Sequence, residues 1–127
     1  FSAASTANRV IGSVNAPSLM QKVIARSLDA KIDLSFYENN MRDLYNGLSE
    51  CGFQCVRPQG AFYLWVKSPV EDDNSFCEMG KKFNILMGPG SYFACPGYVR
   101  LSYCVSNETI KNSIPAFRKL AEEYNLL

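Results

Sequence analysis

The chain contains no histidine, and this absence excludes several kinds of chemistry. Zinc sites of the Cys/His type, Ser-His-Asp and Cys-His nucleophile systems, and acid–base catalysis by imidazole all need that side chain. An acyl-transfer or metal-dependent hydrolase is therefore disfavoured. Any catalysis by these residues would have to use lysine, tyrosine, cysteine or carboxylate groups.

An excess of one charge and long apolar runs are also missing. The 13 basic residues nearly balance the 12 acidic ones and are scattered along the chain, so we expect no binding of nucleic acid or of an anionic membrane. No apolar run is long enough to span a bilayer, and the first residues carry no signal-peptide pattern. We therefore expect a cytoplasmic protein.

Cysteine is present but not in a pattern that suggests pairing. The five cysteines are an odd number with no CxxC motif, which argues against a disulfide framework and against a metal site. We predict no metal and reduced thiols that pack as small hydrophobic groups. They are Cys51, Cys55, Cys77, Cys95 and Cys104.

The first half of the chain has helical periodicity. After the entry signature Asn15-Ala16-Pro17, with a capping side chain and a proline in the first turn, apolar residues recur at helical spacing as far as Ile32. A second stripe begins at Tyr37 and predicts a helix that ends near Cys51, where Gly52 supplies a left-handed C-cap.

The second half alternates between strand and helix patterns. We expect strands over 53–56, 61–66 and 84–87 and from Tyr98 onward, with a short helix before residue 84. Ser106 caps a last helix, in which Pro115 should kink the helix or shift its start. The predicted fold class is α/β of the α+β kind, a small and mostly antiparallel sheet covered by helices. Strands 53–56 and 61–66 should form a hairpin, with a crossover connection after Val66.

The strand from Tyr98 onward carries one charged residue, Arg100. Alternation places Arg100 on the face opposite Val99 and Leu101, and a glycine-rich stretch over 87–93 precedes the strand. A guanidinium held by a sheet offers a planar fork of donors that fits a carboxylate. Arg100 is thus either a site for small carboxylic acids or an ordinary surface arginine. The aromatic residues of strand 61–66 are more typical of a core, and the acidic run 71–73 is typical of a solvated connection.

Three motifs in order resemble the C-terminal part of the class I/II aminotransferases, the fold-type-I pyridoxal-phosphate-dependent enzymes of the aspartate aminotransferase group. They are Pro58-Gln59-Gly60-Ala61-Phe62-Tyr63-Leu64, Gly88-Pro89-Gly90-Ser91-Tyr92-Phe93 and Gly97-Tyr98-Val99-Arg100-Leu101-Ser102-Tyr103. The segment Asn15-Ala16-Pro17-Ser18 with Gln21 is similar to the opening of the family's small domain, and the resemblance runs from about Val14 to Tyr124.

The resemblance implies roles for three residues. Arg100 falls on the arginine that binds the substrate α-carboxylate, and Phe62 falls on an aromatic position that lines the substrate side of the pocket. Asn15 lies in a segment that runs near the active site of the partner subunit in related enzymes. Arg9 fits neither a side-chain nor a phosphate arginine cleanly and receives no assignment.

One element of the family's chemistry is absent. No lysine lies in the Ser-x-x-Lys or Ser-Lys-like context of the Schiff-base lysine. We therefore expect residues 1–127 to be one domain, the C-terminal small domain of a larger aminotransferase, with residues 1–14 as a lead-in from the large domain. On its own it should be inactive, contribute no catalytic residue and bind no pyridoxal phosphate tightly.

In the intact enzyme the resemblance implies an amino acid and a 2-oxo acid as substrates, pyridoxal 5'-phosphate as cofactor, the missing large domain as partner, and a homodimer. The alternative is a non-enzymatic module that binds small carboxylates or another protein.

Overall fold

The computed structural model describes residues 2–12 and 15–127. The chain divides into two compact units, Phe1–Asp33 and Leu34–Leu127. Among the described residues, no helix is long and apolar enough to cross a membrane.

The first unit contains helices α1 (Ser2–Val10) and α2 (Ser18–Ala25), and every residue described in it is exposed. The predicted extension of α2 to Ile32 is wrong. The Ser27 hydroxyl donates to the Val23 carbonyl at 2.8 Å and the helix stops, as expected for a side chain that competes for backbone partners. Asn15 does not cap α2 either, because Pro17 takes the N-cap position with no side-chain cap hydrogen bond. Helix α1 was not predicted, since its small and polar residues form no apolar stripe.

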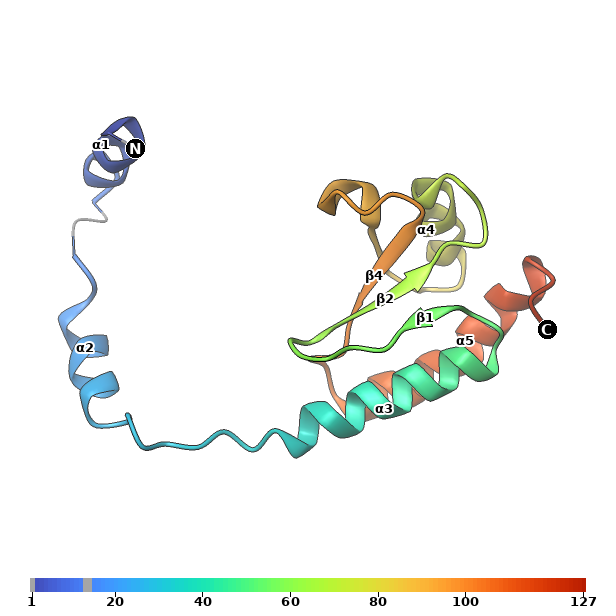
Figure 1. The fold of residues 1–127 in the computed structure, drawn as a ribbon, viewed down its shortest axis with the longest axis horizontal. Helices are drawn as coiled ribbons and strands as arrows, with labels where there is room; N and C mark the ends of the chain where they lie inside the picture. Colours follow the sequence, from blue (N-terminus) through green and yellow to red (C-terminus); the bar gives the residue numbers. More distant parts are fainter. Residues whose placement is uncertain (1, 13–14) are drawn as a thin grey trace. The chain divides into compact units, whose positions relative to one another are not determined.

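The second unit is built on a four-stranded sheet with the order β1-β2-β4-β3 and antiparallel pairing throughout. The strands are β1 (Cys55–Val56), β2 (Tyr63–Lys67), β3 (Gly88–Pro89) and β4 (Tyr98–Ser102). The predicted fold class and the β1–β2 hairpin are confirmed. The two longest strands, β2 and β4, lie side by side at the centre of the sheet (Figure 1). The connection between them passes through a helix and the edge strand β3.

Helices α3 (Ser35–Glu50) and α5 (Asn107–Glu123) lie next to each other along one face of the sheet (Figure 1). The two helices are in close contact at Gly47, where an added Cβ would lie only 2.5 Å from the Ile114 Cδ1 atom. Helix α3 ends as predicted, with Gly52 at a φ of 84° and the Phe53 N–H bonded to the Leu48 carbonyl. The core between helices and sheet includes Leu48, Leu64, Val66, Phe76, Val99, Leu101, Phe117 and Leu120.

The segment between α4 (Asp73–Lys82) and β4 differs from the prediction. Asn84 has a φ of 60° and the Ile85 N–H returns to the Gly80 carbonyl, so residues 84–87 form a turn and an extended link. The third strand begins only at Gly88, and a 3-10 helix, η1 (Gly90–Phe93), follows it. Helix α5 begins at Asn107, with the Ser106 side chain accepting from the Thr109 N–H. Pro115 therefore does not shift the start of α5.

Candidate functional site

The face of the sheet turned away from α3 and α5 carries the candidate site. Leu64, Val66, Val99 and Leu101 are buried on the helix side. Their neighbours in sequence point the other way, and Arg100 on β4 is paired with Trp65 on β2 and with Gly88 on β3. The alternation predicted for this strand is confirmed, and it places a cation at the middle of the open face.

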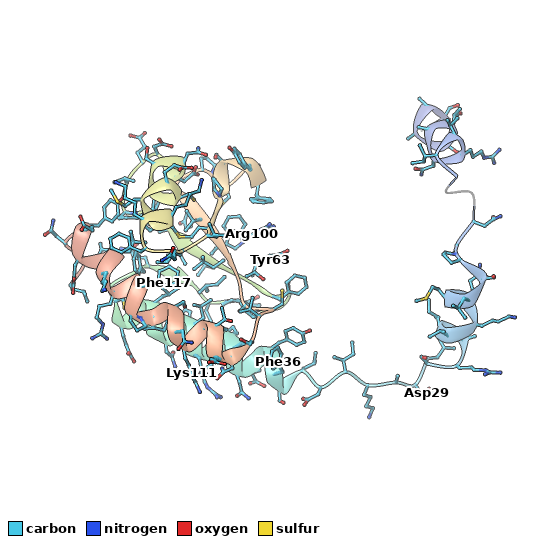
Figure 2. All side chains as sticks on the ribbon, turned by 180° about the vertical axis from the view of Figure 1, so that it is seen from behind. Asp29, Phe36, Tyr63, Arg100, Lys111 and Phe117 are labelled. Atoms are coloured by element: carbon cyan, nitrogen blue, oxygen red, sulfur yellow. The ribbon has the colours of Figure 1, made fainter. Side chains whose placement is uncertain are left out.

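The Arg100 guanidinium is stacked between two aromatic rings. Its Cζ atom lies 4.0 Å from the centre of the Tyr63 ring and 3.7 Å from that of Phe93. The Cζ atom therefore lies over the faces of both rings. Arg100 and Tyr63 lie close together in Figure 2, on neighbouring central strands. Trp65 braces this stack, with its ring edge-on to Phe93 at 6.1 Å. Each stacked ring contributes about 0.5–2 kcal/mol of attraction, so the guanidinium is held in one place.

The stack leaves the N–H rim of Arg100 available. Within Leu34–Leu127, an ion pair joins Lys81 to Glu78, and no carboxylate of this unit pairs with Arg100. A guanidinium held over aromatic rings can still donate in its own plane, and two parallel N–H donors match the two oxygens of a carboxylate. The arrangement can therefore bind a carboxylate in a fixed orientation.

Phe62 lies beside this stack. Its ring centre is 4.8 Å from that of Tyr63, and the ring is 41% exposed. The Phe62 carbonyl accepts from the Tyr103 N–H at 3.0 Å, and the Tyr103 hydroxyl donates to the Ala61 carbonyl at 2.9 Å. These bonds fix the backbone at the entry to β2. The aromatic residues Phe62, Tyr63 and Trp65 thus lie outside the core in which the sequence placed them, because β2 turns its aliphatic residues inward.

The candidate residue Asn15 and the unassigned Arg9 both lie in the first unit. Asn15 is exposed and precedes α2, and Arg9 is exposed in the last turn of α1. Both are described within that unit alone, so the role implied for Asn15 stays a prediction.

The prediction that residues 71–73 are a solvated acidic run is wrong for Asp73, which is 2% exposed. Its carboxylate accepts from the backbone N–H groups of Ser91 at 2.9 Å and Gly97 at 3.1 Å. No local pattern predicts this burial, because the hydrogen-bond partners lie 18 and 24 residues further along the chain. A single carboxylate thus ties α4 to the turn that carries Phe93.

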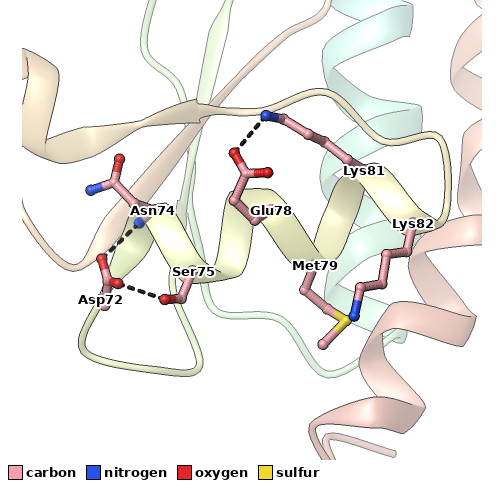
Figure 3. A pocket seen from close by; sticks show the side chains of 7 residues that line it. All are labelled: Asp72, Asn74, Ser75, Glu78, Met79, Lys81 and Lys82. Atoms are coloured by element: carbon pink, nitrogen blue, oxygen red, sulfur yellow. Dashed lines mark hydrogen bonds and ion pairs between the residues drawn. The ribbon is translucent and has the colours of Figure 1, made fainter.

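The neighbouring Asp72 has a different role. It caps α4 by accepting a hydrogen bond from the Asn74 N–H. Hydrogen bonds lower the pKa of Asp72, and the bond from the Ser75 hydroxyl contributes more than the bond from the Asn74 N–H. Figure 3 shows this surface of α4, where the Glu78–Lys81 pair lies one turn further on. The polar groups here satisfy one another. In the described part of the chain, no cluster of three or more potential metal ligands occurs.

The five cysteines are free, as predicted. Burial raises the pKa of Cys55 and of Cys77 to about 11, so both are thiols at neutral pH. Cys51 is also buried, whereas Cys104 is exposed at the end of β4.

The sequence and the fold were compared with known proteins. Residues 2–117 match the family described as "Aminotransferase class I and II". An aminotransferase from Eubacterium rectale has a structure that matches 94% of this chain and 30% of its own, with a TM-score of 0.86 and 46% identity. The aspartate aminotransferase from Thermus thermophilus with maleate matches 68% of this chain and 23% of its own, with a TM-score of 0.65 and 31% identity.

Curated relatives give the same result. The aromatic-amino-acid aminotransferase 2 of Thermococcus litoralis is 32% identical over 96 residues, which is 72% of this chain and 25% of the relative. The chain therefore spans about a quarter of the length of the curated relatives that it matches.

Proposed function

This chain belongs to the class I and II aminotransferase family, and from that premise we propose that it is the part of a pyridoxal-phosphate-dependent aminotransferase that binds the substrate α-carboxylate. Arg100 is the residue that holds it. The observation that carries this proposal is the stack of Arg100 on Tyr63 and Phe93, with no carboxylate of Leu34–Leu127 paired with its N–H groups.

Arg100 orients the substrate through the geometry of its donors. Two parallel hydrogen bonds to a carboxylate fix the plane of that group as well as its position. The amino group of a bound amino acid is then presented in one direction, which is the contribution of orientation to rate. Phe62 and Tyr63 line the same side and exclude water from the contact.

The lysines of this chain do not fit the role of holding pyridoxal phosphate as an imine. A lysine that forms imines is normally desolvated so that its pKa falls. Here every lysine is exposed, and the Glu78 carboxylate raises the pKa of Lys81. We place the imine-forming lysine and the acid that holds the pyridine nitrogen in the remaining three quarters of the enzyme. Pyridoxal phosphate supplies the electron sink for transamination when it is bound there.

A direct test uses this chain alone. After incubation with pyridoxal phosphate and borohydride, we expect no absorption band of an imine and no lysine labelled in one-to-one stoichiometry. A single labelled lysine together with transaminase turnover would show that the chain is a complete catalyst and would contradict the proposal.

The relatives support a carboxylate as the common part of the substrate. One is an aspartate aminotransferase solved with maleate, a dicarboxylate, and another acts on aromatic amino acids. Their side-chain preferences differ, whereas an amino acid and its 2-oxo acid always retain the α-carboxylate. We therefore propose an amino acid and a 2-oxo acid as the substrates of the intact enzyme.

The role of Arg100 is tested on the intact, cofactor-loaded protein with two substrates. One is an L-amino acid that it converts, chosen from alanine, aspartate and phenylalanine. The other is the amine left when the α-carboxylate is removed. Arg100→Gln should lower kcat/KM for the amino acid by about 100-fold or more, from the loss of two charge-assisted hydrogen bonds worth about 1.5–3 kcal/mol each, and should leave the amine unchanged. Arg118→Lys, at an exposed position on α5, is the matched control. Equal losses for both substrates would refute the assignment.

We also propose that the intact enzyme is a homodimer in which Asn15 lies near the active site of the partner subunit. The resemblance of the segment at Asn15 to the entry of the family's small domain supports this. Sedimentation of the intact protein as a monomer at high concentration would contradict it.

A further inference from the structure

We propose that Asp73 is a positioning residue for carboxylate binding, acting through the turn from Ser91 to Gly97 and through Phe93 on Arg100. The inference rests on the proposed function of Arg100 and adds to it a buried acid on a different element, helix α4. Asp73 touches neither Arg100 nor any group assigned to the substrate.

Asp73 accepts hydrogen bonds from both ends of the turn. Its Oδ2 atom accepts from the Ser91 N–H at 2.9 Å and from the Gly97 N–H at 3.1 Å. Its Oδ1 atom accepts from the Ser91 hydroxyl at 2.9 Å and from the Asn74 amide at 3.2 Å. The side chain is 2% exposed and has no cationic partner in the described chain. A buried carboxylate without a cation depends on such donors, so the turn and the acid hold each other.

The turn between these two anchors is tightly closed. The Cys95 N–H donates to the Gly90 carbonyl at 2.9 Å, and Ala94 adopts the left-handed conformation with a φ of 55°. Phe93 lies inside this closed segment and contributes the ring that is 3.7 Å from the Arg100 Cζ atom. The position of that ring is therefore set by backbone atoms that Asp73 holds.

The consequence for Arg100 follows from the stack. Phe93 is 43% exposed, and its ring contacts with Arg100 and Trp65 do not fix its backbone, so the ring shifts if the turn relaxes. When the ring moves, one face of the guanidinium is uncovered, and the side chain can adopt other rotamers. A displacement of about 1 Å in a group that orients substrate can cost about 100-fold in rate. The loss should concern only substrates that use Arg100.

The variants separate positioning from general stability. Asp73→Asn keeps the shape of the side chain but removes the charge and one acceptor. Ser91→Ala removes the hydroxyl, which donates to Asp73 and accepts from the Asn74 amide at 3.4 Å, and leaves the backbone N–H bonds to Asp73. Asp72→Asn is the matched control, because Asp72 is the adjacent acid and caps α4 without contacting the turn. Each variant is made in the intact, cofactor-loaded protein and in the 127-residue chain.

The kinetic readout is the pair of substrates already described, an L-amino acid and the amine that lacks its α-carboxylate. Asp73→Asn should lower kcat/KM for the amino acid by about 10-fold or more and leave that for the amine within about two-fold. Ser91→Ala should lower the ratio of kcat/KM for the amino acid to kcat/KM for the amine as well, but by less than Asp73→Asn. Asp72→Asn should leave this ratio unchanged.

The spectroscopic readout needs no activity. The chain has one tryptophan, and Trp65 lies edge-on to Phe93. The near-ultraviolet circular dichroism of Trp65 in the 127-residue chain should weaken in Asp73→Asn, while the far-ultraviolet spectrum is retained. Asp72→Asn should leave the Trp65 signal intact.

Each outcome decides between the two proposals. Equal losses for amino acid and amine in Asp73→Asn would make Asp73 a purely structural residue and overturn this inference, as would an unchanged ratio. If Asp73→Asn does not fold, Ser91→Ala decides by the same ratio. If Arg100→Gln loses both substrates equally, the proposed function itself fails. A selective loss in Arg100→Gln without one in the Asp73 and Ser91 variants overturns only the role of Asp73.

Discussion

Replacing Gly90 with alanine is expected to open the turn beside Arg100. A Cβ at Gly90 would lie 2.1 Å from the Cys95 carbonyl oxygen and 2.5 Å from the Tyr98 carbonyl oxygen. Both are backbone atoms, and Tyr98 begins the central strand β4. Neither can rotate away as a side chain would, so the turn must move by about 1 Å to make room.

The cost combines two effects. Overpacking of this kind costs about 1–3 kcal/mol, and opening the turn breaks the hydrogen bond from the Cys95 N–H to the Gly90 carbonyl, worth about 1 kcal/mol. We therefore expect Gly90→Ala to lower the free energy of unfolding by about 3 kcal/mol. Gly60→Ala is the control, because nothing lies within 4 Å of its Cβ position, and its effect should stay within about 0.5 kcal/mol.

The assay is urea unfolding of the 127-residue chain, followed by Trp65 fluorescence and far-ultraviolet circular dichroism. With a slope of about 1–3 kcal/mol per molar urea for a small protein, the midpoint for Gly90→Ala should fall by about 1 M or more at unchanged slope. A loss below about 0.5 kcal/mol would refute the close packing of this turn and, with it, the fixed position of Phe93.

Three further predictions concern stability and reactivity. Asn40 is 1% exposed and donates to the carbonyls of Tyr103 and Val105, which follow β4. Asn40→Ala should therefore lower the free energy of unfolding by about 2–3 kcal/mol, measured by the same urea titration. The exposed thiol of Cys104 should react rapidly with a disulfide reagent at pH 8, whereas Cys77, whose pKa is about 11, should react only after unfolding. Equal rates would contradict the burial. Hydrogen bonds, first from Ser75, lower the pKa of Asp72, so the ionised cap should stabilise α4 at neutral pH and weaken as the pH falls below about 4, measured as smaller amide protection factors in the first turn.

The sequence predicted those features of the site that depend on local patterns. Alternation along β4 placed Arg100 opposite Val99 and Leu101, and the structure confirms it. The C-cap at Gly52 was predictable for the same reason, since a glycine after a helical stripe acts within one turn. The order of elements in the second unit follows from local periodicity, and the β1–β2 hairpin follows from its short connection, whereas the pairing of β2 with β4 does not.

The features that were missed depend on distant contacts. Asp73 looked solvated beside Glu71 and Asp72, and it is buried only because Ser91 and Gly97 return to it. The strand expected over 84–87 carries suitable residues. However, the turn that ends α4 uses part of this backbone, because the Ile85 N–H bonds to the Gly80 carbonyl. The stack of Tyr63 and Phe93 on Arg100 likewise needs the register of β2 with β4, which a single sequence does not specify.

The central claim is that Arg100 holds the α-carboxylate of the substrate, and a crystal structure of the intact enzyme with a bound amino acid or 2-oxo acid tests it most directly. We predict both carboxylate oxygens within hydrogen-bond distance of the Arg100 guanidinium, about 2.7–2.9 Å, with Tyr63 and Phe93 still stacked on it. A carboxylate bound by other residues, with the Arg100 rim facing solvent or protein, would contradict the account.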